Sequence, residues 1–236
     1  MPRMARIVVP GVPYHIFNRG NRKADVFILD SDKLLYLRLL DEFGEKFGVS
    51  YLAYCLMNNH FHLNAIAETE TSFAKCFAEV NRRYTYIINT REGWTGNIWE
   101  GRYHSFPMDG AYLFNCVRYS EQNPVKANIV RRAEEYPWSS AAEHISGTRQ
   151  SILKLADIRK YLDIPDWSRY LETENDPALA ERIELHARTG RPLGSKEFIE
   201  RLEILSGRAL FPRRAGRKKT LELLAAPTII GLNHEG

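Results

Sequence analysis

Two histidines separated by a single residue are the part of this sequence best suited to chemistry. His60 and His62 lie in a stretch of alternating residue types, residues 60–67, that predicts a β-strand. Side chains two positions apart on a strand project from one face, so both imidazoles can bind the same cation. Phe61 and Leu63 alternate with them, as a buried opposite face requires. Pairs of this kind are more often polar surface or core histidines, so the pair needs support from the rest of the chain.

A tyrosine and an asparagine four positions apart form the second candidate. Residues 111–122 predict a helix that Asp109 caps and that stops or kinks at Asn123 and Pro124. Tyr119 and Asn123 share one face of this helix. From spacing alone, core packing accounts for such a tyrosine equally well. A catalytic role therefore depends on the helix lying next to the histidine pair.

The elements that must position these residues follow from hydrophobic periodicity and turn signals. Strands are predicted at residues 14–18, 49–57, 60–67 and 102–108, and helices at residues 31–47, 71–88 and 111–122. The order β-α-β-β-α-β followed by a helix predicts an α+β fold of the ferredoxin-like type, an antiparallel sheet with two helices on one face. Residues 60–67 then form a central strand of this sheet.

This topology also predicts which side chains face each layer. His60, His62 and Asn64 should point to the open face of the sheet, and the helix at residues 111–122 must lie across or beside that face. The opposite side of the same strand should pack beneath the two helices through Phe61, Leu63, Ala65 and Ala67. The helix at residues 71–88 has a predicted buried stripe of Phe73, Phe77, Val80, Tyr84 and Ile87.

Composition bounds the class of protein. The chain has 236 residues, 44% hydrophobic and 26% charged, which is typical of a globular protein. No apolar run approaches the roughly 18 residues that span a bilayer, and the N-terminal residues do not resemble a signal peptide. We therefore expect a cytoplasmic protein with no membrane partner. The three cysteines, Cys55, Cys76 and Cys116, lack metal-site spacing and are predicted to be buried thiols.

Positive charge is concentrated near the C-terminus. The net charge of +4 is modest, but residues 206–220 contain six basic residues and no acidic one. Smaller clusters occur at residues 19–23 and 82–83. Solvated surface is an equal alternative for any one cluster, whereas the clusters together favour a polyanionic partner. The residue pattern changes after about residue 146, so we predict two parts, residues 1–146 and residues 147–236.

Two motifs together resemble a known family. Residues 57–63 (MNNHFHL), combined with residues 119–127 (YSEQNPVKA), resemble the single-tyrosine HUH transposases and, more narrowly, the REP-associated tyrosine transposases. Supporting stretches are residues 13–20 (PYHIFNRG), 99–103 (WEGRY) and 136–140 (YPWSS), and a looser similarity occurs at residues 189–194 (TGRPLG). The resemblance covers residues 5–145 strongly. This chain departs from the family at three positions: proline is usual where Asn59 stands, an apolar residue where Asn64 stands, and often lysine where His104 stands.

The resemblance implies an enzyme and its mechanism. It predicts an HUH transposase catalytic domain in residues 1–146, which nicks and rejoins single-stranded DNA near hairpin (REP-like) sequences through a 5′-phosphotyrosine intermediate. Tyr119 is the implied nucleophile. His60 and His62, with Asn123 as a third ligand, are the implied site for Mg²⁺ or Mn²⁺. Residues 147–236 are then a C-terminal helical appendage with a basic segment that contacts DNA.

The implied partner is single-stranded or hairpin DNA, bound by a monomer or a homodimer. Phosphate pairing and base stacking would be supplied by basic, aromatic and amide side chains near the sheet and in the appendage. The predicted DNA-binding residues are Asn18, Arg19, Arg22, Lys23, Arg82, Arg83, Arg102, Tyr103, His104, Arg118, Lys126, Arg191, Arg208, Arg213, Arg214, Arg217, Lys218 and Lys219.

Two other functions fit the same fold. The first is a module that binds single-stranded nucleic acid without catalysis, since ferredoxin-like sheets often do so by stacking. It predicts aromatic residues on the open face, where this sequence places histidines. The second is a metal-dependent phosphodiesterase in which water attacks and Tyr119 is structural. A covalent protein–DNA adduct would distinguish both from the transposase.

Overall fold

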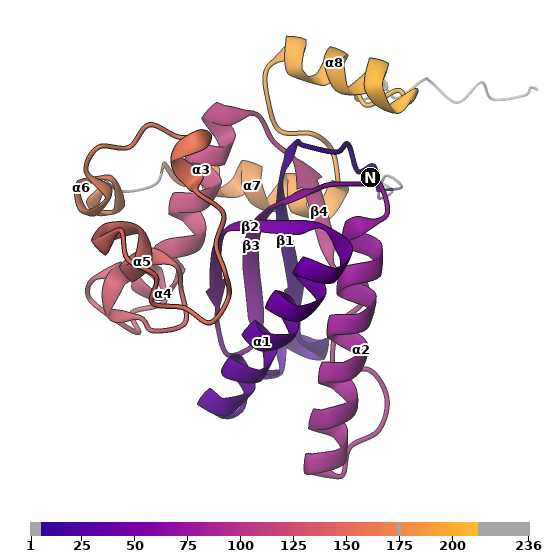
Figure 1. The fold of residues 1–236 in the computed structure, drawn as a ribbon, viewed down its shortest axis with the longest axis vertical. Helices are drawn as coiled ribbons and strands as arrows, with labels where there is room; N and C mark the ends of the chain where they lie inside the picture. The colour runs from indigo at the N-terminus through magenta and orange to yellow at the C-terminus, as the bar shows by residue number, and fades with distance from the viewer. Residues whose placement is uncertain (1–5, 174–175, 212–236) are drawn as a thin grey trace, which may run out of the picture.

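The computed structural model describes residues 6–173 and 176–211 and contains one four-stranded antiparallel sheet (Figure 1). The strand order is β2-β3-β1-β4, so β1 and β3 are central. The strands are β1 (Pro13–Arg19), β2 (Val49–Leu56), β3 (His60–Ala67) and β4 (His104–Pro107). The predicted α+β class, the ferredoxin-like order and the central place of residues 60–67 are confirmed.

Two long helices cover one face of the sheet. They are α1 (Asp30–Phe47) and α2 (Ser72–Glu92), and the side chains of β3 that alternate with its histidines pack beneath them. The predicted stripe of α2 is correct from Phe73 to Tyr84, but its last member is wrong. Ile87 is 39% exposed, whereas Ile88 is buried, because four-residue steps from Tyr84 lead to position 88. All three cysteines are free and buried, as predicted.

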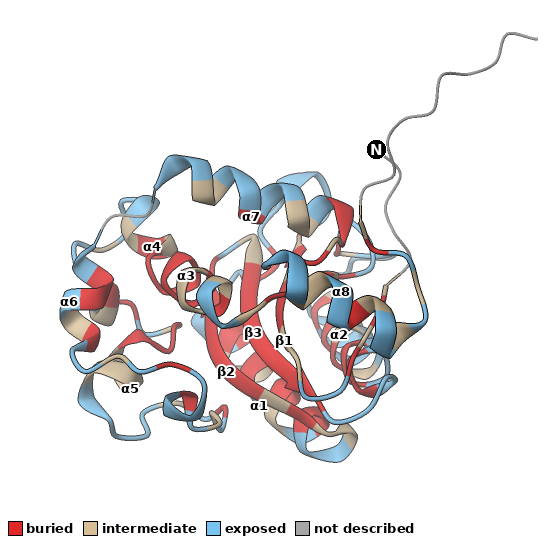
Figure 2. Ribbon diagram, turned by 90° about the horizontal axis from the view of Figure 1, so that it is seen from above, coloured by how far each residue is buried: buried red, intermediate tan, exposed pale blue. Residues whose placement is uncertain are grey.

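The other face of the sheet is covered by α3 (Gly110–Glu121) and α7 (Pro177–Thr189), so it is not open (Figure 2). The remaining helices are α4 (Asn123–Lys126), α5 (Ala141–Ser146), α6 (Trp167–Glu172) and α8 (Lys196–Ser206), with short 3-10 turns at Asn21–Lys23, Ala133–Glu135 and Ile158–Lys160. None of the helices in the described ranges has the length and apolar character needed to cross a membrane.

Residues beyond 146 pack into the same core as the predicted catalytic part. Trp167 and Ile183 share one hydrophobic cluster with Leu52 of β2 and Val117 of α3. Backbone pairing also links Leu155 to Tyr51. The division of the chain at residue 146 into a catalytic part and an appendage stays a prediction about function. Among the described residues, the two parts share one hydrophobic core.

We expect Phe61→Ala to destabilise the fold strongly. Phe61 is fully buried and its ring lies 5.3 Å from Tyr36 and 5.5 Å from Trp99, centroid to centroid. Loss of the ring leaves a cavity, so the free energy of unfolding should fall by about 3–5 kcal/mol in urea titrations. Ile204→Ala is the control, since Ile204 is 82% exposed and its loss should change stability by less than about 0.5 kcal/mol. Equal effects of the two substitutions would contradict the assignment of this core.

Candidate functional site

A cavity of about 250 Å³ lies between the sheet and the helices α3 and α7. It contains all four residues of the predicted catalytic and metal set: His60 and His62 on β3, Tyr119 on α3, and Asn123 at the start of α4. The other lining residues are His15, Phe17, Arg19, Glu100, His104, Ile183, Glu184, Ala187 and Arg188. The fold thus brings together residues that are about 60 positions apart in sequence.

Strand register explains why the histidines face this cavity. In the β1–β3 pair His15 lies opposite Asn64, Phe17 opposite His62, and Arg19 opposite His60. Directly opposed residues share a face, so this side of the sheet carries polar and aromatic groups while Phe61 points to the core on the other side. The ring of His62 lies 5.1 Å from that of His60 and 5.3 Å from that of Tyr119, perpendicular to each.

Burial keeps both imidazoles neutral. Desolvation, followed by the charge of Arg19, lowers the pKa of His60 to about 4. Desolvation and then the neighbouring His60 and His15 hold the pKa of His62 well below its usual value. A neutral imidazole has one nitrogen lone pair available, and which nitrogen carries it depends on the hydrogen bond made by the other.

The hydrogen bonds of His60 leave its lone pair on Nε2. The Nδ1 of His60 lies 2.6 Å from the amide oxygen of Asn59. The amide nitrogen of Asn59 donates to the carbonyl of Lys23 over 3.1 Å, which orients the oxygen towards His60. Nδ1 of His60 is therefore the protonated nitrogen. Metal-binding histidines commonly have this arrangement, with the outer ring nitrogen held by an oxygen acceptor.

A longer hydrogen-bonded chain orients His62 in the same way. Ser120 donates its hydroxyl to the carbonyl of Cys116 and accepts from the amide nitrogen of Asn64. The amide oxygen of Asn64 then accepts from Nδ1 of His15 over 3.2 Å. With that proton on Nδ1, Nε2 of His15 accepts from Nδ1 of His62 over 3.1 Å. This assignment satisfies every partner and leaves the lone pair of His62 on Nε2, to which the amide nitrogen of Asn123 donates.

Asn123 completes the group. Its amide lies 3.3 Å from Nε2 of His62, and it also bonds to the side chain of His60. The described residues hold no cluster of three or more His, Cys, Asp or Glu side chains placed to share a metal ion. A cation at this site would therefore bind to the two histidines and to the amide oxygen of Asn123, which turns inwards on rotation of the amide.

The surroundings of Tyr119 disfavour the ionised form of its phenol. It is 8% exposed, and burial, with Glu184 as the next cause, raises the pKa of its phenol to about 12. The ammonium of Lys126 lies 4.7 Å from the centre of the Tyr119 ring, and Arg19 lowers the phenol pKa slightly. The phenol is thus neutral in this cavity, and cationic groups are needed beside it before it can lose its proton.

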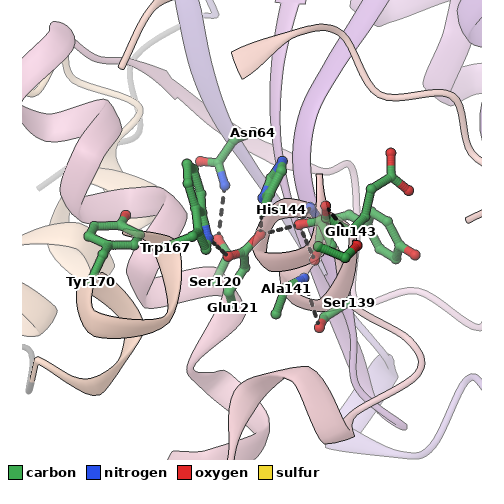
Figure 3. A network of polar contacts seen from close by, with 12 residues as sticks. Asn64, Ser120, Glu121, Ser139, Ala141, Glu143, His144, Trp167 and Tyr170 are labelled. Carbon is green, nitrogen blue, oxygen red and sulfur yellow. Dashed lines mark hydrogen bonds and ion pairs between the residues drawn. The ribbon is translucent and has the colours of Figure 1, made fainter. Parts of the chain in front are cut away.

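A buried carboxylate next to Tyr119 anchors α3 (Figure 3). Glu121 is fully buried and accepts hydrogen bonds from Ser140, from Nδ1 of His144 over 2.6 Å and from the indole of Trp167 over 2.8 Å. These donors come from the start of α5, from α5 itself and from α6. Because a buried carboxylate is costly unless it is hydrogen-bonded, this set holds α3 in one position against the C-terminal helices.

Helix α7 supplies a wall that sequence reasoning did not place in the site. Ile183, Glu184, Ala187 and Arg188 line the cavity, and Nδ1 of His104 donates to the carbonyl of Ala187 over 3.0 Å. The predicted catalytic and metal residues all lie before residue 146, and residues beyond it add to the cavity wall. The sequence of α7 has ordinary helical periodicity, which carries no signal for a surface that only tertiary packing creates.

His15 is the second residue that was missed as part of the site. It lies in the quoted stretch PYHIFNRG and alternates with Phe17, so the register of β1 against β3 was the available signal. Its burial lowers its pKa to about 4, so it acts as a neutral link between Asn64 and His62. Asn64, where the family usually has an apolar residue, is the side chain that makes this link possible.

The predicted DNA-binding residues fall into several places. Arg19 and His104 line the cavity, and Arg22 and Lys23 are exposed in the loop after β1. Asn18 is buried and bonds to the carbonyl of Gly101. Lys126 lies over Tyr119, as described above.

The other predicted residues are not at the cavity. Arg82 and Arg83 lie on α2, where both pair with Glu79. Arg118 is buried against the rings of Phe114 and Tyr170. Arg102 and Tyr103 lie in the loop before β4. In the C-terminal part, Arg191 bonds to the carbonyl of Leu210 and Arg208 to that of Arg6. Outside the described residues lie Arg213, Arg214, Arg217, Lys218 and Lys219.

Comparison with known proteins defines the class. Residues 8–123, just under half of the chain, match the family model described as "Transposase IS200 like". This part of the chain holds β1 to β4, both histidines, Tyr119 and Asn123. No curated protein sequence matches the chain.

Two solved structures were compared with this chain. A REP-associated tyrosine transposase bound to a REP hairpin is 18% identical, with a TM-score of 0.54 over 70% of this chain and 96% of that one. A protein described as a transposase of Deinococcus radiodurans R1 is 19% identical, with a TM-score of 0.36 over 51% of this chain and 97% of that one. The first likeness confirms the fold.

Replacing Asn64 by Leu should change the tautomer of His62. Without the amide oxygen, the proton of His15 is free to move to Nε2, which then donates to Nδ1 of His62 and shifts the proton of His62 to Nε2. Imidazole ¹⁵N chemical shifts report this directly. Asn115→Leu, on the same helix as Tyr119 but outside the cavity, is the control. An unchanged His62 spectrum in the Asn64 variant would refute the proposed chain of hydrogen bonds.

Proposed function

We propose that this protein is a metal-dependent transposase that cuts and rejoins single-stranded DNA next to hairpins, using Tyr119 as the nucleophile. The observation that carries the proposal is the meeting of Tyr119 with two neutral, similarly oriented imidazoles in one cavity. The match of residues 8–123 to the IS200-like transposase family model supports a transposase role. The proposal places the protein in the cytoplasm, and monomer or homodimer remains the prediction for its assembly.

His60, His62 and Asn123 would hold the metal ion. Two imidazole nitrogens and an amide oxygen suit Mn²⁺ or a weakly held Mg²⁺. When bound, the ion polarises the scissile phosphate and neutralises the charge that develops on it. The hydrogen bonds of Asn59 and His15 keep Nδ1 of each imidazole occupied, so that each Nε2 is presented to the ion.

The oxygen of Tyr119 would attack the phosphorus atom of the strand. A bond forms between this oxygen and phosphorus while the bond from phosphorus to the 3′ oxygen breaks. The phenol loses its proton to solvent, and the departing 3′ oxygen takes one up. The phosphodiester is conserved as a 5′-phosphotyrosine, so a 3′-hydroxyl can reverse the step without a nucleotide cofactor. Arg19 and Lys126 are the cations placed to favour the ionised phenol.

The walls of the cavity favour an unpaired substrate. At about 250 Å³, and flanked by α3 and α7, it has room for one phosphate with its nearest atoms and not for two paired strands. The solved structure of the REP-associated relative is described as bound to a REP hairpin. We therefore propose that a single-stranded flank of a hairpin enters this cavity.

One observation favours the hydrolytic alternative. Burial raises the pKa of Tyr119 to about 12, which makes the phenol a poorer nucleophile than an exposed tyrosine. In this second function a water molecule attacks the phosphate and Tyr119 only packs. The two functions differ in whether DNA becomes bonded to the protein.

Tyr119→Phe should abolish covalent DNA attachment and leave DNA binding intact. Removal of the hydroxyl takes away the attacking atom but keeps the ring that packs against His62. The assay is a denaturing gel after incubation with labelled hairpins that carry single-stranded flanks. Tyr112→Phe, on the same helix but outside the cavity, should form adduct like the parent protein. Cleavage by the parent protein without any adduct would instead establish the hydrolytic function.

Chelation should remove adduct formation, and Mn²⁺ should restore it. His60→Ala and His62→Ala should each weaken Mn²⁺ binding by at least about tenfold, in line with losses on disturbing metal sites. Asn123→Ala should weaken it less, because water can replace the amide oxygen. Isothermal titration of the free protein with Mn²⁺ measures this without DNA, with Asn115→Ala as the control. Full adduct formation in excess EDTA would rule out the metal site.

A further inference from the structure

A second and larger cavity lies on the side of the molecule formed by α2, Arg6 and residues 96–103. Its volume is about 800 Å³. The residues that give it chemical character are Arg6, Arg82, Tyr86, Trp99, Arg102 and Tyr103. Arg82, Arg102 and Tyr103 were predicted to bind DNA from the sequence, whereas Arg6, Tyr86 and Trp99 were not. Their common wall suggests that these residues serve one ligand.

The charge of this cavity is of one sign. Three arginines line it and no aspartate or glutamate is among its lining residues, although Arg82 pairs with Glu79 next to it. The guanidinium carbon of Arg6 lies over the ring of Tyr103, 3.8 Å from its centre. A site with fixed cations and aromatic walls is suited to an anionic ligand that also has a flat apolar surface.

Two buried donors in this wall lack acceptors. Nη2 of Arg6 and Nε1 of Trp99 are buried and make no hydrogen bond within the described part of the chain. Trp99 is 2% exposed and is one of the residues that line this cavity. Buried hydrogen-bond donors are almost always paired in native proteins. These two unpaired donors therefore indicate a ligand that has several hydrogen-bond acceptors. Phosphate oxygens and the carbonyl oxygens of nucleobases meet this requirement.

The rim of the cavity offers a stacking surface. Tyr86, on α2, is 70% exposed, far more than a tyrosine needs to solvate its hydroxyl alone. Its neighbour along the helix on the same rim is Arg82, four residues earlier. An exposed ring beside a cation is the arrangement by which proteins hold unpaired bases independently of sequence.

The loop before β4 connects the two cavities. Glu100 lines the catalytic cavity, while the next residues, Gly101 and Arg102, line this one. The loop is held to β1 by hydrogen bonds from Glu100 to the carbonyl of Arg19 and from Asn18 to the carbonyl of Gly101. The loop therefore borders both cavities, so a DNA strand that follows it would contact each of them.

We propose that this second cavity binds an unpaired nucleotide of the same DNA strand whose phosphate enters the catalytic cavity. The base stacks on Tyr86, and its acceptors or the adjoining phosphate bond to Arg6 and Trp99. This inference rests on the proposed function for the identity of the ligand. In this proposal the second cavity holds the single-stranded flank of the hairpin, away from Tyr119, both before and after cleavage.

Fluorescence anisotropy with Tyr119→Phe protein tests the proposal without cleavage. The probes are a labelled DNA hairpin alone and the same hairpin with a randomised eight-nucleotide flank on the 5′ or the 3′ side. Tyr86→Ala and Arg6→Ala should each reduce the affinity for a flanked hairpin about tenfold, as loss of one stacked base does. Neither should alter binding of the bare hairpin. Tyr161→Ala, which removes an exposed tyrosine outside the cavity, should change neither affinity.

An abasic flank separates stacking from charge. Against this probe Tyr86→Ala should lose its effect, whereas Arg6→Ala should keep part of its effect through the phosphates. Wild-type affinity of both variants for every flanked probe would overturn the proposal, as would tighter binding of an RNA flank than of a DNA flank. Arg102→Ala removes a second arginine of the same cavity. Because Arg102 is exposed, this substitution should leave the fold intact even if Arg6→Ala does not. Failure of the parent protein to form adduct would refute the proposed function while this binding comparison still decides the cavity.

Discussion

The pairing of β1 with β3 is the constraint on which the site depends. This pairing sets Phe17 opposite His62 and His15 opposite Asn64, so all four side chains lie on one face of the sheet. A slip of one residue would turn His60 and His62 towards the layer of α1 and α2 and would move Phe61 to the face that lines the cavity. The register is held by the hydrophobic core because Phe61 and Leu63 are fully buried beneath those helices.

Buried polar contacts then fix the distance between the sheet and the helix that carries Tyr119. Ser120 reaches through Asn64 and His15 to His62, and Glu121 is bonded on the other side to α5 and α6. Hydrophobic packing alone allows small rotations of a helix, whereas paired polar groups in a low-dielectric interior have strong directional preferences. The two residues that follow Tyr119 therefore orient it more narrowly than its own packing does.

The C-terminal part of the chain acts on the site through packing. Helix α7 covers the face of the sheet that carries the histidines and adds Glu184 and Arg188 to the cavity wall. Glu100, in the loop before β4, lines the same cavity as these residues of α7. That loop also borders the cavity of Arg6 and Tyr86, so one short segment relates the two places where the proposed substrate would be held.

The sequence by itself determined the order of strands and helices and the face of β3 on which the histidines lie. It also identified these histidines and Tyr119 as candidate residues of one site. Local periodicity is sufficient for these, since the alternation of a strand and the stripe of a helix are encoded by near neighbours. It did not determine that Ile88 rather than Ile87 is buried, that His15 links Asn64 to His62, or that α7 closes the cavity. Those features arise from contacts between residues that are distant in the chain. Only the tertiary structure decides which helix covers the second face of the sheet, because many amphipathic helices have the same hydrophobic pattern.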